Sequence, residues 1–109
     1  MSGTDTPAGS ALDGLDPALT APKRLAAMAL LSRAAAADFG VLRAHLGVSE
    51  SDLSKQMTAL VTAGYATVRK SGRGRGSATT YQATSAGRKA YARHRAALEA
   101  ILAGTADDS

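Results

Sequence analysis

The sequence contains no cysteine and no tryptophan, and only 4% of its residues are aromatic. Without cysteine the chain can form neither disulfide bonds nor thiolate metal sites. No apolar run approaches the roughly eighteen residues that a membrane-spanning helix needs. The first residues, MSGTDTPAGSALDG, lack the basic start and the apolar segment of a secretion signal. We therefore expect a cytoplasmic protein that folds without covalent cross-links or a cofactor.

Acidic residues are scarce in the middle of the chain. All 13 lysines and arginines lie between Lys23 and Arg95, where only Asp38, Glu50 and Asp52 oppose them. Thirteen positive charges less three negative ones leave this segment with a net charge of +10. A basic centre with acidic ends indicates a polyanionic partner. A charged surface that serves only solubility gives the same pattern, so composition alone does not decide.

With 109 residues, the chain has room for one folded domain with its own core. Its two ends are rich in small and polar residues and poor in apolar ones. We expect a disordered N-terminal tail over residues 1–14, one domain over 15–102, and a disordered C-terminal tail over 103–109.

Three helices are predicted in the first part of the domain. The first has Thr20 as its expected cap and Pro22 in its first turn. The second lies in DFGVLRAHLG and ends at Gly47, and a short extended segment can precede it. The third lies in VSESDLSKQMTALVTAGY, between Ser49 as cap and Gly64 at its end. This third helix has one apolar face, and its opposite face is small, polar and singly basic.

The stretch RKSGRGRGSATTYQAT sets arginines among glycines and has β-prone segments on both sides. Its glycines lead into a strand rather than a helix, and their spacing departs from G-x-G-x-x-G, which excludes a nucleotide-binding loop. A disordered arginine–glycine tract stays open, but the paired flanking segments favour a β-hairpin. Arg73 and Arg75 would lie at its tip, with Arg69 and Lys70 at its base.

A last helix is predicted in TSAGRKAYARHRAALEAIL, with Thr84 as its cap. Tyr91, His94, Leu98 and Ile101 recur along it at helical spacing. This stripe fits either packing against the first helix or pairing with a second copy. The expected fold class is therefore mostly α with a small β-hairpin, in the order α-α-α-β-β-α.

These elements and their sequences resemble the small winged helix-turn-helix transcriptional regulators related to the MarR and ArsR families. LGVSESDLSKQMTALVTAGYATVRK is similar to their turn, recognition helix and first wing strand, and TTYQATSAGRKAY to the second strand and the start of the last helix. The resemblance covers about residues 15–101. It implies a sequence-specific regulator of transcription that binds double-stranded DNA, and we expect a repressor.

The resemblance also implies which residues bind DNA. The helix from Ser49 to Ala63 would enter the major groove, and the wing tip, residues 72–76, would contact the minor groove or the backbone. Phosphate contacts would position the protein without specifying sequence. The candidate DNA-binding residues are Ser51, Ser54, Lys55, Thr58, Arg69, Lys70, Arg73, Arg75, Lys23 and Arg43.

A homodimer is expected, because such proteins bind two half-sites. Protonation of an interfacial His94 would then weaken the dimer at mildly acidic pH. Many MarR relatives are longer, with extra helices that form a dimerisation domain and an effector crevice, whereas this chain has only its first and last helices for that purpose. Whether it binds a small-molecule effector therefore stays open. The thiolate metal sensing of ArsR proteins is excluded because the chain has no cysteine. We expect no metal role for His45 or His94. The candidate interface residues are Leu12, Leu15, Leu19, Tyr91, His94, Leu98 and Ile101.

Two alternatives to DNA binding stay open. A winged-helix scaffold can serve as a protein-interaction module or as an antitoxin-like partner. Binding of structured RNA is the other, although Tyr81 alone offers little stacking surface near the hairpin. An enzyme is not expected, because the chain has no cysteine nucleophile, few acids outside its ends, and no serine in a nucleophile-elbow context.

Overall fold

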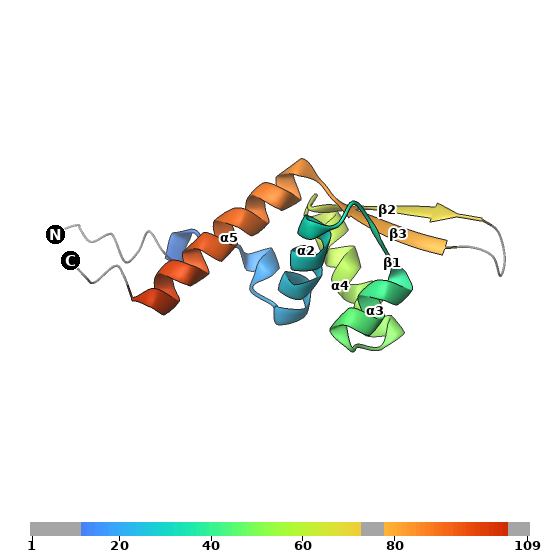
Figure 1. The fold of residues 1–109 in the computed structure, drawn as a ribbon, viewed down its shortest axis with the longest axis horizontal. Coiled ribbons are helices and arrows are strands. Elements are labelled where there is room, and N and C mark those ends of the chain that lie inside the picture. Colours follow the sequence, from blue (N-terminus) through green and yellow to red (C-terminus); the bar gives the residue numbers. More distant parts are fainter. Residues whose placement is uncertain (1–11, 73–77, 105–109) are drawn as a thin grey trace.

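The computed structural model describes residues 12–72 and 78–104. A central group of helices carries a β-hairpin on one side and a long C-terminal helix on the other (Figure 1). In chain order the elements are η1 (Pro17–Leu19), α2 (Pro22–Arg33), β1 (Ala37–Asp38), α3 (Phe39–Leu46), α4 (Glu50–Thr62), β2 (Ala66–Ser71), β3 (Ala78–Ala83) and α5 (Ser85–Ala103).

Short polar side chains begin three of the helices, because each accepts a hydrogen bond from a backbone amide that the first turn leaves unpaired. Asp38 accepts from Val41 N in α3, Ser49 from Asp52 N in α4, and Thr84 from Gly87 N in α5. The sequence predictions for Ser49 and Thr84 are therefore confirmed.

The predicted cap of the first helix was wrong. The residue before α2 is Ala21, which makes no side-chain cap, and Pro22 occupies the first helical position. The Thr20 hydroxyl instead donates to the carbonyl oxygen of Asp16 at 2.9 Å. The local sequence did not reveal the preceding short helix η1, which ends just before Thr20.

The strands form a three-stranded antiparallel sheet in the order β1-β3-β2. The predicted hairpin is confirmed as β2 and β3, with Arg69 opposite Thr80 and Lys70 opposite Thr79. The short extended segment expected before the second helix is also confirmed, because Ala37 and Asp38 pair with Tyr81 and Thr80 of β3. This pairing joins the hairpin to the start of α3.

The hydrophobic core lies where α2, α3, α4 and the inner face of the sheet meet. The third helix presents its apolar row to this core as predicted, and Leu53, Met57 and Leu60 are fully buried. Burial of such side chains stabilises the fold by about 1.5–3 kcal/mol each. The other large residues with no exposed surface are Leu19, Met28, Leu31 and Leu42.

The first turn of α5 lies against the backbone that follows α4. The backbone amide of Thr84 donates to the carbonyl of Tyr65 at 3.0 Å, and the Thr84 hydroxyl donates to the carbonyl of Gly64 at 2.7 Å. Gly87 is buried at this crossing, where a β-carbon would lie 2.1 Å from the Tyr65 carbonyl oxygen. Glycine is required here because the two backbones approach so closely.

Asp16 attaches the segment before α2 to the rest of the domain. Its backbone amide donates to Nδ1 of His94 at 2.8 Å. Its carboxylate accepts the Ala18 amide at 2.9 Å and the Tyr65 hydroxyl at 2.5 Å. The chain just before α2 is thereby fixed both to α5 and to the turn that follows α4.

The hydrogen bond between Tyr65 and Asp16 stabilises the fold, and this stabilisation is lost at alkaline pH. The hydrogen bond to Asp16, with burial and the charge of that carboxylate, raises the pKa of Tyr65 above its ordinary value of 10.0. The stabilisation is therefore complete below pH 10.0 and is lost as pH rises through the raised pKa. At neutral pH we expect wild type to have a higher melting temperature than Tyr65→Phe. The difference between the two melting temperatures should shrink at alkaline pH. Thermal melts across this range test it, and a difference independent of pH would contradict it.

Candidate nucleic-acid interface

One face of α4 is exposed, polar and free of large apolar side chains. Ser51, Ser54, Lys55 and Thr58 are all exposed, whereas Leu53 and Met57 on the opposite side are fully buried. This division follows the helical period of the sequence. Serine and threonine can donate or accept hydrogen bonds at base edges, and lysine can donate to guanine.

The turn between α3 and α4 is fixed by the chain itself. Gly47 ends α3 in the left-handed conformation at φ 67°, and its amide donates to the carbonyl of Arg43 at 2.8 Å. The side chain of Arg43 adds a second bond across the turn, from its Nε to the carbonyl of Val48 at 3.1 Å. Arg43 was predicted to contact phosphate. It is exposed, and it lies at the turn that leads into α4.

The start of the wing lies beside the first turns of α4. A hollow of about 430 Å³ separates them, and Ser51, Ser54 and Thr79 contribute to its lining together with Phe39 and Glu50. Lys70 is paired with Thr79 and shares its face of the sheet, since side chains alternate along a strand. Lys70 therefore lies on the α4 side of the hairpin.

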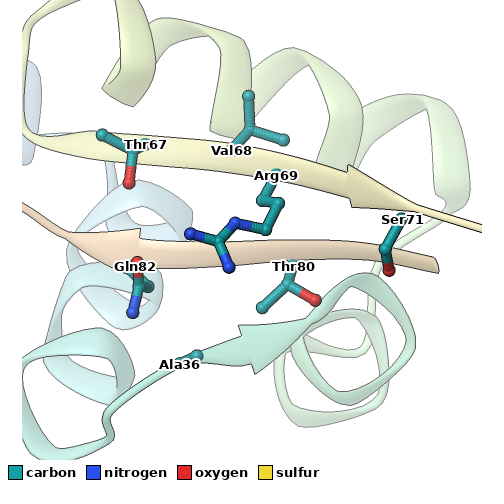
Figure 2. Close-up of a pocket in the computed structure, with 7 residues that line it drawn as sticks. All are labelled: Ala36, Thr67, Val68, Arg69, Ser71, Thr80 and Gln82. Carbon is teal, nitrogen blue, oxygen red and sulfur yellow. The ribbon is translucent and has the colours of Figure 1, made fainter.

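Arg69 lies on the opposite face of the same hairpin. Figure 2 shows its guanidinium extending across β3, with Thr67, Thr80 and Gln82 on the same side of the sheet. These residues line a second hollow, of about 410 Å³. Arg69 and Lys70, which the sequence placed together at the base of the hairpin, thus lie on opposite faces of the sheet. Of the two, only Lys70 lies on the face that borders the hollow at α4.

Lys23 is paired with an acid of α4. Its ammonium binds the Asp52 carboxylate, whose other oxygen accepts the Gln56 amide at 2.9 Å. Both bonds hold the pKa of Asp52 below its ordinary value of 3.8, and the bond from Lys23 has the larger effect. Half of the Lys23 side chain stays exposed, at 50%. The sequence indicated a DNA contact at Lys23, but it did not reveal the Asp52 partner.

Some candidate residues lie outside the part of the chain that the structure describes. Arg73 and Arg75, expected at the wing tip, belong to residues 73–77.

Phe39, Glu50 and Thr79 line the hollow at α4 but were not predicted as site residues. Thr79 lies 25 positions after Ser54 in the sequence, so only the folded arrangement brings the two together.

The candidate interface residues for a second copy fall into three groups: buried, exposed and partly buried. Leu19 and His94 have 0% and 1% exposure within one protomer, so both are occupied by intramolecular contacts. Leu12, at 59%, and Ile101, at 37%, are exposed, as is Leu102, at 81%, which was not predicted. Tyr91 and Leu98 line a largely apolar groove of about 370 Å³ between α2 and α5, together with Pro22, Leu25, Ala26, Ala29 and Arg95.

Two features were not found among the residues that the structure describes, a metal-ligand cluster and a membrane-spanning helix. Across residues 12–72 and 78–104, no three His, Asp or Glu side chains gather as metal ligands. No helix within these ranges has the length and apolarity needed to cross a membrane.

A helix-turn-helix whose second helix exposes a polar face, followed by a β-hairpin that extends from the body, defines the winged-helix class. A family model described as "Winged helix DNA-binding domain" matches residues 23–102. The chain therefore belongs to this family of DNA-binding domains, as its sequence indicated. A search of curated proteins by sequence returned no significant match.

Solved structures of the same fold are numerous, with 17 significant matches. A transcriptional regulator homologue from Pyrococcus horikoshii is 21% identical, covers 91% of this chain and 96% of its own, and superposes with a TM-score of 0.78. A homodimeric winged helix-turn-helix DNA-binding domain from Mycobacterium bovis is 19% identical, with 94% of each chain covered and a TM-score of 0.66. A MarR-family regulator from Rhodococcus is 18% identical, with 92% and 73% covered and a TM-score of 0.63. At these identities the likeness concerns the fold.

Proposed function

We propose that this protein is a sequence-specific regulator of transcription that binds double-stranded DNA as a homodimer. The observation that carries the proposal is the exposed polar face of α4, which stands beside the basic hairpin β2–β3 and is backed by fully buried Leu53, Met57 and Leu60. A rigid helix with short polar side chains suits the major groove, whose width admits a helix. The DNA-binding family to which the chain belongs supports the same conclusion.

The proposed contacts divide by chemistry. Ser51, Ser54, Lys55 and Thr58 contact base edges and nearby phosphates from α4, and Lys70 contacts the backbone from the adjacent side of the wing. Arg43 binds phosphate at the turn, and Lys23 does so at the start of α2. Arg73 and Arg75 bind the minor groove or the backbone beyond Gly72. Arg69, on the outer face of the hairpin, contributes long-range attraction more than direct contact.

A dimer would join two copies through α5 and the segment before α2. An apolar groove lies between α2 and α5, Ile101 and Leu102 are exposed at the end of α5, and Leu12 is exposed in the segment before α2. Leu15, Tyr91 and Leu98 are partly buried there and complete the proposed surface. The homodimeric domain from Mycobacterium bovis has the same fold, which supports the proposal of a homodimer.

The double variant Ile101→Glu/Leu102→Glu is expected to dissociate the dimer, because it places two charges in an apolar contact. Loss of the second half-site would weaken operator binding by at least about 100-fold. Sedimentation gives the oligomeric state, and circular dichroism should show an intact fold because both residues are exposed. Val41→Glu, on an apolar residue of α3 that is also exposed, is the matched control for oligomeric state. An unchanged dimer in the double variant would contradict this interface.

Repression is the proposed mode of regulation, because a bound dimer would occlude a promoter without any further domain. A titration of the protein against a duplex from upstream of its own gene, and against a random duplex of equal length, tests the function. We expect tighter binding to the upstream duplex and an affinity that falls steeply with salt, with a slope of about −0.9 for each phosphate contact. In Arg73→Ala/Arg75→Ala the affinity should fall less steeply with salt. Absence of binding to any duplex at low salt would refute the function and favour a protein-interaction module.

A further inference from the structure

A row of polar side chains connects α2 to α4 beside the core. Lys23 binds one oxygen of Asp52, and Gln56 donates to the other at 2.9 Å. Arg24 then donates from Nη1 to Oε1 of Gln56 at 3.2 Å. We call these four residues, Lys23, Arg24, Asp52 and Gln56, the α2–α4 ladder. Asp52 and Gln56 lie one turn apart on α4, between its buried row and its exposed face.

The ladder continues beyond α2 to the segment that precedes it. Nε of Arg24 donates to the carbonyl of Ala18 in η1 at 2.7 Å. The same short helix is capped by Asp16, whose backbone amide donates to His94 of α5. One arginine, partly buried, therefore contacts both the segment fixed to α5 and the helix that carries the proposed DNA-binding face.

Hydrogen bonds of this kind control orientation in a way that the apolar contacts of α4 do not. Leu53, Met57 and Leu60 hold α4 against the body through contacts that are not directional. Hydrogen bonds weaken steeply when their angle or length changes, and those made by a guanidinium are among the stronger ones. The ladder thus limits rotation and sliding of α4 relative to η1 and α5.

We infer that Arg24 is a positioning residue for DNA recognition, which sets the angle of α4 relative to the dimer surface through Gln56 and Ala18. The inference rests on the proposed function and on the dimer formed by α5 and the segment before α2. In such a dimer, the orientation of α4 within each protomer determines the distance and angle between the two recognition helices. Arg24 therefore selects the spacing of the two half-sites without touching the DNA.

The test compares Arg24→Met with wild type on a series of duplexes whose half-sites, obtained by selection with wild type, are separated by different spacings. Methionine keeps much of the aliphatic stem and removes every donor. We expect the preference of wild type for its best spacing to fall by about tenfold in Arg24→Met, an effect on the scale of one lost charged hydrogen bond. The salt dependence of binding to random duplex should stay unchanged, because Arg24 contacts no phosphate.

Arg33→Met is the matched control, since it makes the same change to an exposed arginine in the last turn of α2. It should keep the spacing preference of wild type. If Arg24→Met fails to fold, Gln56→Leu removes the same connection from the α4 side and should give the same loss of preference. Melting curves of all variants separate a change of stability from a change of specificity.

Three results would overturn the inference. One is a spacing preference in folded Arg24→Met, or in Gln56→Leu, equal to that of wild type. Another is an equal loss in Arg33→Met, and the third is a salt slope reduced by about 1, which would identify Arg24 as a phosphate contact. Failure of wild type itself to prefer any duplex would refute the proposed function instead, so the wild-type and variant measurements distinguish the two claims.

Discussion

Gly87→Ala is expected to destabilise the domain more than any other single methyl addition at the glycines that the structure describes. A β-carbon at this position would lie 2.1 Å from the Tyr65 carbonyl oxygen and 2.9 Å from its carbonyl carbon. Both are backbone atoms, so no flexible side chain can move aside. Relief requires α5 to separate from the turn after α4, which strains the bonds from Thr84 to Gly64 and Tyr65.

The expected loss of stability in Gly87→Ala is at least about 2 kcal/mol, because overpacking against backbone exceeds the usual penalty of a buried methyl. For a domain of this size the melting temperature should fall by about 10 °C or more. Gly40→Ala is the control, since a β-carbon there would meet only the Asp38 carboxylate, at 3.5 Å. This second variant should melt within a few degrees of wild type. Equal melting of wild type and Gly87→Ala would show that the crossing is looser than described.

Lys55→Ala/Thr58→Ala is expected to abolish most sequence-specific DNA binding while leaving the fold intact. Both side chains lie on the exposed face of α4, so neither contributes to the core. Two contacts of about 1–3 kcal/mol each would be lost, which corresponds to a decrease of about 100-fold in affinity for the preferred duplex. Binding to random duplex should fall much less, because phosphate contacts at the turn and the wing remain.

Titration of the double variant against preferred and random duplexes measures this loss. Lys89→Ala removes a cation of the same kind from an exposed position on α5, away from the proposed contacts, and should bind both duplexes as wild type does. A double variant that retains the specificity ratio of wild type would show that this face of α4 does not contact bases. A loss of equal size in Lys89→Ala would instead place α5 at the DNA.

Local sequence signals were sufficient for most of the secondary structure. Ser49 and Thr84 cap their helices, Gly47 ends α3, and the period of Leu53, Met57 and Leu60 gives the buried face of α4. Each depends on residues within one or two turns, where chemistry and spacing specify the conformation. The exposed face of α4 followed directly from the same period.

Contacts between distant segments could not be predicted in this way. Leu19 belongs to the core of one protomer, and the buried His94 accepts a hydrogen bond from the amide of Asp16, 78 positions earlier in the chain. The hydrogen bond from Arg24 to Gln56 likewise joins two separate helices. Neither residue type nor periodicity reveals which polar side chains meet, because the docking of whole elements decides it.

The most direct test of the account is to map the backbone amides whose NMR resonances shift when the preferred duplex is added. We predict that the largest shifts fall on Ser51, Ser54, Lys55 and Thr58 of α4 and on Lys70 of the wing. Amides of the exposed C-terminal part of α5 should change little. Shifts confined to α5, with α4 and the hairpin unaffected, would contradict the proposal that the protein binds DNA through the exposed face of α4.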